Sequence, residues 1–437
     1  MRIGLVAMSG LRVQNTALKE LGLTMPGVLE RGQIVASLPS LGLLTLAGMT
    51  PPEFDVSYEE VDGPVNDSLV HQDIDLVAIS SFTARIRDAY ALADAYRTQG
   101  SKVVLGGLHV SAVPDEAMKH ADSVVIGEGE LSWPSLLEDF KKGNLKPVYD
   151  GRGMSFDLAH APIPRFDLLD TDRYNRLTVQ TQRGCPFSCE FCAASIRISP
   201  AFKLKPVDRV IAEIRRIREI WPSPFIEFAD DNTFANKRHG KRLLQALQHE
   251  HIRWFTETDI SVAEDDELLG LMRDSGCKQV LIGLESPTHS GLTGVELKAD
   301  WKAKQLDRYM DGIARIQQRG ITVNGCFVLG LDGTGHEEFE AVEQFVRDSG
   351  LYDVQITVLT PFPGTPLYER LRQEGRLLKE EAWEHCTLFD VNFRPQQMSA
   401  EELESAFLEL ARKLYDRGSW TERLAVMANR FGIGLQR

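Results

Sequence analysis

The chain has 437 residues, too many for one ordinary hydrophobic core, so its length predicts two or three domains. Apolar residues make up 43% and charged residues 26% of the chain, and no apolar run approaches the roughly 18 residues that a membrane span needs. The formal net charge of -14 argues against nucleic acid or an anionic membrane as the main partner.

The first eight residues form a short apolar run with one charged side chain. This run predicts a first strand, because a signal peptide would have a longer apolar core and a cleavage site. We therefore expect a cytoplasmic protein. Cys277, Cys326 and Cys386 stand singly among apolar neighbours, which indicates buried, unpaired thiols in a reducing compartment.

Short apolar runs alternate with helical patterns from residue 1 to about 145. This alternation predicts a parallel sheet covered on both faces, a doubly wound Rossmann-like domain whose ligands bind where the strands end. The strands are expected at 3–8, 56–61, 75–80, 102–107 and 123–127, and the helices at 40–48, 86–99, 115–120 and from 132.

Small or polar residues follow three of these strands and could let a large planar ligand approach the backbone. The stretches Gly106–Ala117 and Gly127–Glu130 resemble the cobalamin (vitamin B12)-binding domain that precedes the catalytic domain in one large group of enzymes. The resemblance implies cobalamin as a cofactor. The residues that it places near cobalamin are Ser80, Ser81, Gly106, Gly107, His109, Gly127, Glu128 and Gly129.

The Asp-x-His-x-x-Gly sequence that supplies a cobalt ligand in some cobalamin domains is absent from this chain. Relatives without that sequence still hold cobalamin, with no histidine on the metal. The alternative is a Rossmann-like domain that serves only substrate access or packing. For His109 the alternative is a hydrogen bond at the start of a helix.

Residues 146–175 contain several glycines and prolines with mixed charges, which predicts a linker on the surface. An apolar run at 177–180 follows it. Gly184 then lets the backbone turn sharply into a cysteine-rich loop.

Three cysteines stand close together at Cys185, Cys189 and Cys192, with the spacing C-x3-C-x2-C. An ordinary iron–sulfur cluster takes four cysteines and structural zinc takes four donors, so three ligands leave one position open for a substrate. The alternatives are a zinc loop with a distant fourth ligand, or cysteines that merely pack.

The cysteine spacing, with the aromatic Phe191 just before the last cysteine, resembles the signature of the radical S-adenosylmethionine (SAM) enzymes. The resemblance implies that the three cysteines bind a 4Fe-4S cluster. In that family SAM chelates the fourth iron through its amino and carboxylate groups. Phe187 and Phe191 could shield such a cluster from water.

Six strand-helix repeats follow between residues 176 and about 370, which predicts a partial (β/α)6 barrel with its chemistry at the carboxyl ends of the strands. Polar clusters stand at those ends. The family resemblance places SAM there. The residues that it implies as SAM contacts are Phe191, Asp230, Asp231, Thr258, Asp259, Glu285, Phe327 and Leu359. Each carboxylate alone could equally cap a helix or lie on the surface.

Residues 371–437 read as a small helical region, in which Ser399 and Glu402 form a capping box. In the related enzymes this region shapes the substrate pocket. His385 and Tyr415 could therefore touch substrate, although core or surface positions are equally compatible with the sequence.

Together these features predict a radical SAM enzyme that acts on a small molecule, with a cobalamin-dependent methyltransferase as the leading hypothesis. Transfer of the 3-amino-3-carboxypropyl group of SAM, a radical rearrangement or cyclisation, and a non-enzymatic iron–sulfur or zinc regulator stay open as alternatives. An electron donor such as flavodoxin or ferredoxin would be a partner.

Overall fold

The computed structural model describes residues 1–10, 13–21, 38–66, 69–193 and 201–431. The chain divides into two compact units. The first comprises Met1–Arg12, Ile34–Gly184 and Ile196–Pro224, and the second comprises Val13–Gln33, Cys185–Ser195 and Phe225–Arg437. No helix in the described ranges is long and apolar enough to cross a membrane.

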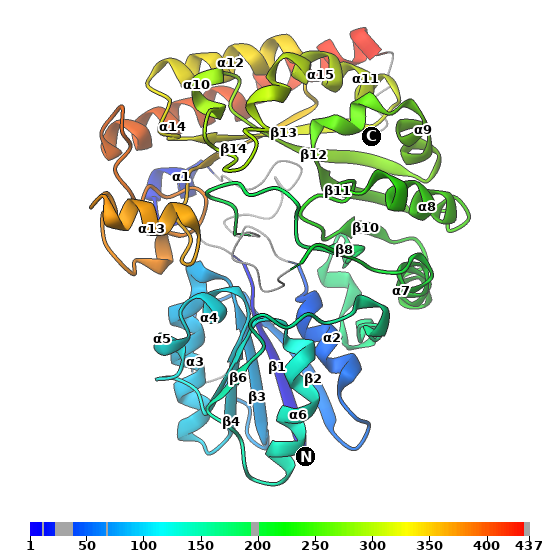
Figure 1. Cartoon of the computed structure of the whole chain (residues 1–437), viewed down its shortest axis with the longest axis vertical. Coiled ribbons are helices and arrows are strands. Elements are labelled where there is room, and N and C mark those ends of the chain that lie inside the picture. Colours follow the sequence, from blue (N-terminus) through cyan, green and yellow to red (C-terminus); the bar gives the residue numbers. More distant parts are fainter. Residues whose placement is uncertain (11–12, 22–37, 67–68, 194–200, 432–437) are drawn as a thin grey trace. The chain divides into compact units, whose positions relative to one another are not determined.

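The first unit contains a parallel sheet, its covering helices and a small two-stranded ribbon (Figure 1). Its elements are β1 (Arg2–Met8), α2 (Leu41–Met49), β2 (Asp55–Val61), β3 (Leu76–Ser81), α3 (Ile86–Thr98), β4 (Lys102–Gly106), α4 (Leu108–Ala112), α5 (Pro114–Ala117), β5 (Ser123–Ile126), α6 (Gly129–Lys141), β6 (Val148–Asp150), β7 (Leu177–Val179), β8 (Gln182–Arg183), β9 (Lys203–Leu204) and α7 (Val207–Ile220).

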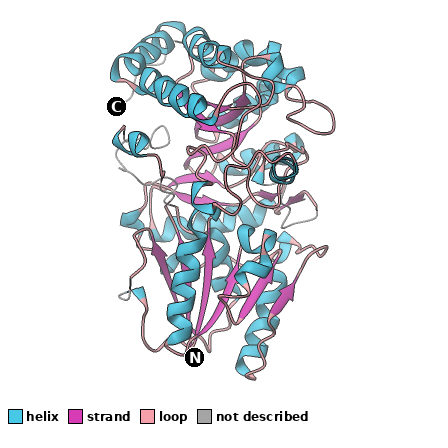
Figure 2. Cartoon of the chain, turned by 90° about the vertical axis from the view of Figure 1, so that its left-hand side faces the viewer, coloured by secondary structure: helices cyan, strands magenta, loops and turns pink. Residues whose placement is uncertain are grey.

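The strands of the first sheet follow the order β2-β1-β3-β4-β5-β6, and neighbouring strands are parallel throughout. The order reverses at β1. Because parallel crossovers are right-handed, this reversal puts helices on both faces of the sheet (Figure 2). The predicted doubly wound sheet is therefore confirmed, and its reversal point is where ligands bind in such sheets.

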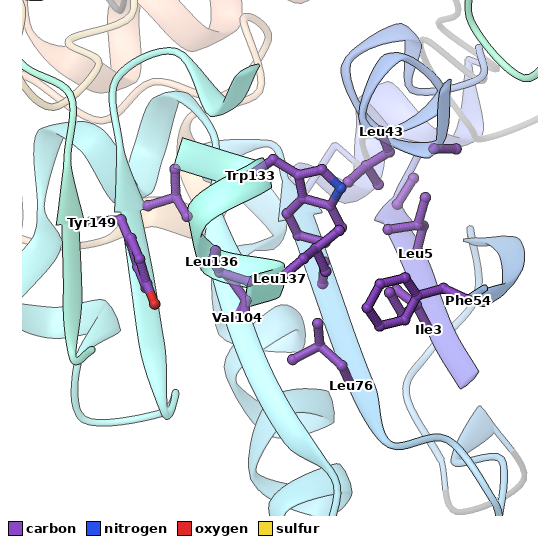
Figure 3. Packing of buried hydrophobic residues seen from close by; sticks show 14 residues of the cluster. Ile3, Leu5, Leu43, Phe54, Leu76, Val104, Trp133, Leu136, Leu137 and Tyr149 are labelled. Carbon is purple, nitrogen blue, oxygen red and sulfur yellow. The ribbon is translucent and has the colours of Figure 1, made fainter. Parts of the chain in front are cut away.

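Helices α2 and α6 cover one face of this sheet. Leu43 of α2 and Trp133 of α6 pack over Leu5 and Leu76 of the central strands (Figure 3). The Trp133 Nε1 donates a 2.9 Å hydrogen bond to Thr50 Oγ1, so its polar edge is satisfied inside the core. Each such apolar side chain contributes about 1.5 to 3 kcal/mol of burial free energy.

The second unit contains the strands of another parallel sheet and the helices from α8 to α15 (Figure 1). Its elements are α1 (Thr16–Glu20), β10 (Phe225–Phe228), α8 (Lys237–Leu247), β11 (Arg253–Thr258), α9 (Asp266–Asp274), β12 (Cys277–Glu285), α10 (His289–Leu292), α11 (Tyr309–Gln318), β13 (Thr322–Leu329), α12 (Glu337–Ser349), β14 (Asp353–Val358), α13 (Pro366–Gln373), α14 (Ala400–Tyr415) and α15 (Arg417–Phe431).

Strands β10 to β14 lie side by side in chain order and are parallel throughout. A strand order that never reverses puts every right-handed crossover helix on the same face. Phe327 illustrates that outer face, because its fully buried ring lies 5.7 Å from Phe345 of α12. The other face of the sheet, which we call the inner face, carries the alternate residues of each strand.

Some elements differ from the sequence prediction. Residues 148–150 of the predicted linker form β6, the edge strand of the first sheet. Helix α6 begins three residues before the expected Ser132, and the short helix α4 was not predicted. The predicted domain boundaries at 145, 175 and 370 do not coincide with the two compact units and stay a prediction. The Ser399–Glu402 capping box is confirmed.

Candidate functional site

The three loop cysteines are partly buried, unbridged thiols. Gly184 has a φ of 81° just before them, in the left-handed region that glycine adopts freely, as the sharp turn requires. Burial raises the pKa of Cys189 to about 12, and both Cys192 and Cys185 add to that rise. The thiols are thus close enough to one another to interact electrostatically.

In the described ranges, no three His, Cys, Asp or Glu side chains are grouped around one point where a single metal ion could bind. A 4Fe-4S cluster makes a different demand, since each thiolate binds a separate iron and the sulfurs surround a group several ångströms wide. Three neighbouring, partly exposed thiols in one short loop fit that larger group.

The cysteine loop is held by the segment that follows α10. Cys189 and Glu296 face each other in an antiparallel bridge. The Glu190 N–H donates to the Val295 carbonyl at 2.9 Å, and the Leu297 N–H donates to the Ser188 carbonyl at 3.0 Å. The loop is therefore fastened by backbone hydrogen bonds at its middle.

The buried Glu296 carboxylate strengthens this junction. It accepts four backbone N–H groups, those of Ser188 at 3.3 Å, Lys298 at 3.2 Å, Ala299 at 2.7 Å and Trp301 at 3.5 Å. Burial alone would raise the pKa of Glu296, but these N–H donors hold it below its ordinary value. One side chain thus links the cysteine loop to the segment beside it.

Glu285 ends β12 in an unusual backbone conformation, with a φ of 65° and a shift in strand register between Gly283 and Glu285. The Lys302 ammonium donates to Glu285 Oε1 at 2.9 Å and to the Gly283 carbonyl at 2.6 Å. A Cβ on Gly283 would come within 2.5 Å of Glu285 Oε1, so only glycine leaves room for the carboxylate to fold back.

The polar residues that follow β10 and β11 bond mainly to one another. The Thr258 hydroxyl donates to Asn232 Oδ1 at 3.2 Å, and Asn232 Nδ2 donates to Asp259 Oδ2 at 2.7 Å. Asp230 is buried and accepts from the Thr233 hydroxyl at 2.9 Å. Three predicted SAM contacts, Asp230, Thr258 and Asp259, are therefore built into the end of the sheet.

Asp231 differs from its neighbours because its side chain is exposed and has no hydrogen bond or ion pair within the described part of the chain. Water reaches it from one side, while the protein around its other sides raises its pKa by burial. Asp231 also acts on the pKa of Cys185, so it lies near the cysteine loop. Of the strand-end carboxylates predicted to contact SAM, it is well placed to accept an ammonium group.

The predicted apolar contacts lie at different depths. Phe191 is partly exposed, as a shield beside the cysteines requires. Leu359 is buried, and its N–H donates to the Leu329 carbonyl at 2.9 Å. Phe327 points to the outer face against Phe345, so the structure does not bring its ring to the inner face.

The inner face carries an acidic group that sequence reasoning missed. Glu257 of β11 pairs in register with Leu281, which pairs with Asn324 of β13. Water reaches the Glu257 side chain, yet burial among surrounding atoms raises its pKa to about 8, with Glu227 adding to the rise. A sequence signal for Glu257 exists. It is a charged residue that follows the uncharged Trp254, Phe255 and Thr256 within one strand, and the alternation of side chains places it on the face opposite Thr256.

Two amide side chains share this inner face. Asn324 Oδ1 and Gln355 Oε1 are buried, and neither has a hydrogen-bond partner among the residues that the structure describes. Gln355 pairs in register with Cys326, which pairs with Gly283. Gly283 stands two residues after Leu281, the partner of Glu257, and alternate residues of a strand share a face. The Gln355 side chain therefore lies on the same face as Glu257. The inner face therefore presents polar groups rather than a filled apolar core.

In the first unit, the predicted cobalamin residues of β3 and β4 come together. Ser80 pairs in register with Gly106. Gly107 has a φ of 103°, and a Cβ there would lie 3.1 Å from Ser80 Oγ. The neighbouring Ser81 hydroxyl donates to the Phe82 carbonyl at 2.9 Å. These small residues leave the backbone at the strand ends open to close approach, which fits a large planar cofactor.

His109 does not reach this edge. His109 belongs to α4, and its side chain is buried on the inner side of that helix. The centre of its ring lies 6.5 Å from the centre of the Tyr90 ring of α3, in an edge-on arrangement. Burial lowers the pKa of His109 to about 4, so its imidazole is neutral. The structure thus places His109 inside the domain.

The stretch after β5 serves a structural purpose. Gly127 has a φ of 87°, and its N–H donates to Ser111 Oγ at 3.0 Å. A Cβ on Gly129, at the start of α6, would meet Leu46 at 3.5 Å. The Gly129 distance is an ordinary contact, so only Gly127, with its left-handed backbone, is specifically required beside the buried Glu128.

The Glu128 carboxylate is fully buried and bonds to both strands of the small ribbon. It accepts from Arg183 Nη1 at 2.6 Å and from Lys203 Nζ at 2.5 Å, and it also accepts the Phe156 N–H at 2.8 Å. Arg183 of β8 and Lys203 of β9 are antiparallel partners. Arg183 also bonds to Glu130 at 2.6 Å. Glu128 is thus occupied by protein cations.

The two candidate substrate contacts of the C-terminal region are both partly exposed. The Tyr415 hydroxyl accepts the Ile356 N–H of β14 at 3.1 Å, so this side chain joins α14 to the sheet. His385 is the last residue of a short 3-10 helix, Trp383–His385. Its backbone N–H donates to the Ala382 carbonyl at 3.0 Å.

Sequence profiles of three known families match the chain. The radical SAM superfamily matches residues 179–346 and the B12 binding domain matches residues 31–137. A domain of unknown function, DUF4070, matches residues 365–434. The first match contains the three cysteines, and the second contains the strand ends of β3 and β4.

Named relatives cover most of the chain. An uncharacterized methyltransferase of Synechocystis sp. is 29% identical over 88% of this chain and 72% of its own length. The bacteriochlorophyllide d C-12(1)-methyltransferase of Chlorobaculum tepidum is 27% identical over 89% of this chain and 85% of its own length.

A solved structure shares the fold. The radical SAM methyltransferase TsrM from Kitasatospora setae, with cobalamin and a 4Fe-4S cluster bound, has a TM-score of 0.66, 14% identity and coverage of 95% of this chain and 89% of its own. The two resemblances predicted from the sequence are thus confirmed. The chain thus contains a radical SAM domain at residues 179–346, after a B12 binding domain at residues 31–137.

Proposed function

We propose that this protein is a cobalamin-dependent radical SAM methyltransferase that acts on a small molecule. The observation that carries the proposal is the presence, in one chain, of a three-cysteine loop inside the radical SAM match and a B12 binding domain before it. The named methyltransferases that align with most of the chain support the same reaction class.

The residues fit the two cofactors as follows. Cys185, Cys189 and Cys192 would hold a 4Fe-4S cluster, and Asp231 would accept the SAM ammonium. The glycine-rich strand ends around Gly107 would hold cobalamin. When bound, the cluster supplies the electron that cleaves SAM and cobalamin carries the methyl group.

The protein side chains bind and orient these groups. The Glu296 junction keeps the three thiols in one loop. Phe191 excludes water from that loop, and the bulge at Glu285 turns a carboxylate to the side of β12 that carries Gly283, close to the cysteines. A small-molecule substrate and a one-electron donor such as flavodoxin or ferredoxin complete the proposed reaction.

Product analysis of the anaerobically reconstituted protein tests the proposal. With SAM, cobalamin and a reductant, the wild-type chain should form S-adenosylhomocysteine as the methyl group leaves SAM, together with 5'-deoxyadenosine. Methylthioadenosine as the sole product would instead identify 3-amino-3-carboxypropyl transfer and overturn the methyltransferase assignment.

Two controls accompany this measurement. Cys189→Ala should abolish SAM turnover, whereas Cys277→Ala, which removes a buried thiol of β12 outside the loop, should retain the cluster and turnover. Zinc bound through four protein donors, or SAM turnover retained in Cys189→Ala, would refute the cluster assignment.

A further inference from the structure

Lys302 is a buried cation beside the cysteine loop, and neither the predicted motifs nor the matched families give it a role. Its side chain is only 11% exposed, and the carboxylate that it contacts, Glu285, is 10% exposed. Keeping an ammonium group out of water is costly, so a buried lysine with a single carboxylate partner requires a reason.

The surroundings of Lys302 fix its ammonium in one place. Two of its three N–H donors are used, one by the Gly283 carbonyl at 2.6 Å and one by Glu285 at 2.9 Å. Its Nζ also lies 5.9 Å from the centre of the Trp301 ring, within the range of a cation–π contact. The group therefore has little freedom to move away.

The backbone beside Lys302 is attached to the cysteine loop. The segment from Val295 to Trp301 makes the bridge to Cys189 and the hydrogen bonds of the Glu296 carboxylate. Trp301 stacks on Phe187 of the loop, with ring centroids 4.5 Å apart. Lys302 comes directly after these contacts, so its position is set by the same junction that sets the cysteines.

Lys302 and Glu285 carry opposite charges beside the cysteine loop. Both side chains are largely out of contact with water, which therefore screens their charges little. Lys302 directly follows Trp301, which stacks on Phe187 of the loop, and Glu296 of the same segment faces Cys189. The two side chains therefore exert opposite electrostatic effects on the loop that would hold the cluster.

We propose that Lys302 is a positioning residue that sets the reduction potential of the 4Fe-4S cluster, with its ammonium stabilising the reduced state and Glu285 limiting that effect. The inference rests on the proposed function. Reduction adds one negative charge to the cluster, and a fixed buried cation nearby lowers the free energy of that state. Gly283 and the bulge at Glu285 hold the pair in place.

A redox titration followed by electron paramagnetic resonance tests this role. The full chain is reconstituted anaerobically without SAM and titrated with dithionite. Lys302→Met should shift the midpoint potential to more negative values, whereas Glu285→Gln should shift it to more positive values. Lys302→Arg, which keeps the charge, should stay closer to the wild type than Lys302→Met.

Lys304→Met is the matched control. Lys304 is exposed on the same segment and donates to the Ala299 carbonyl at 2.6 Å, so water and salt screen its charge. Its removal should leave the potential unchanged. A purely structural role for Lys302 would not produce shifts of opposite sign in the Lys302 and Glu285 variants.

The outcomes are decisive in each case. If Lys302→Met binds a full cluster at an unchanged potential, the proposal is wrong. If that variant binds no cluster, the Glu285→Gln potential decides, and an unshifted or more negative value overturns the proposal. A wild-type chain with no reducible 4Fe-4S signal would overturn the proposed function as well, whereas a normal signal with no shift overturns only the role of Lys302.

Discussion

Phe187 of the cysteine loop stacks on Trp301, with a 27° angle between the ring planes. The stacked pair joins the loop that carries the three thiols to the segment beside it. Aromatic pairs of this kind contribute about 0.5 to 1.5 kcal/mol beyond their buried area. We therefore expect loss of this contact to shorten the lifetime of a bound cluster.

Trp301→Ala should accelerate loss of the cluster in air by about two- to thirteenfold, the factor that corresponds to the stacking free energy. The decay of the visible absorbance of the reconstituted protein measures this rate. Trp301→Phe keeps a stacking partner and should decay nearly as slowly as the wild type. Equal rates for the alanine variant and the wild type would show that the pair does not protect the cluster.

Glu296→Gln should loosen the junction between the cysteine loop and its neighbour. The neutral amide replaces a carboxylate that accepts four backbone N–H groups, and hydrogen bonds to a charged group are worth about 1.5 to 3 kcal/mol each. We expect iron to be released to a chelator about tenfold faster, since part of this free energy is retained by the amide.

Glu337→Gln provides the comparison for Glu296. Glu337 accepts the Gly335 N–H at 2.9 Å at an exposed position away from the cysteines. Its substitution should leave iron release unchanged. If the two variants release iron at the same rate, the Glu296 junction has no special effect on the loop.

Glu128→Ala should destabilise the first unit by about 3 kcal/mol, because it removes the carboxylate that the partly buried Arg183 and Lys203 share. The loss should lie at the low end for a broken buried pair, since Arg183 keeps its ion pair with Glu130. Urea unfolding of the purified protein measures the loss. Glu138→Ala serves as the control, since Glu138 makes an exposed pair with Lys142 at 3.8 Å and should cost less than about 1 kcal/mol. Similar losses for both variants would contradict a buried role for Glu128.

Glu257→Gln should change the dependence of stability on pH. The pKa of Glu257 is raised to about 8 in the folded protein from the ordinary value of 4.5, so the folded state holds the proton more tightly. The stabilising contribution of that proton is complete below the ordinary value and is lost as pH rises to about 8. Glutamine never ionises and avoids this loss.

The variant and the wild type should therefore melt alike at about pH 5, and the variant should be more stable at about pH 9. Because water reaches the carboxylate, we expect a difference of only about 1 to 2 kcal/mol. Thermal unfolding at both pH values measures it. The exposed Glu138→Gln should show no such divergence, and a constant difference for Glu257→Gln would rule out the raised pKa.

The sequence predicts the architecture well because local patterns determine it. Strand-helix alternation identifies both parallel sheets, and the spacing of Cys185, Cys189 and Cys192 identifies the loop. Each of these signals depends on residues that are close together in the chain. The glycines at 106 and 107 are likewise predicted correctly as strand-end residues, because glycine after a strand is itself a local signal.

The partners of buried charges are not local, and the sequence does not reveal them. Glu128 was predicted as a cofactor contact, but its carboxylate pairs with Lys203, 75 residues away. Lys302 lies in a segment without a clear helical or strand pattern. Its contact with Glu285 depends on the shift in register between Gly283 and Glu285, which no sequence motif predicts. Such pairs become visible only when separate elements are brought together.

The ion pairs of Arg183 and Lys203 with Glu128 have a consequence for maturation of the enzyme. They fix the two ends of the segment that contains the cysteines on one buried carboxylate, and they do so without iron. A freshly translated chain, or one whose metal has been destroyed by oxygen, then has less loop-closure entropy to lose when iron and sulfide are delivered. Assembly and repair would start from a partly organised acceptor.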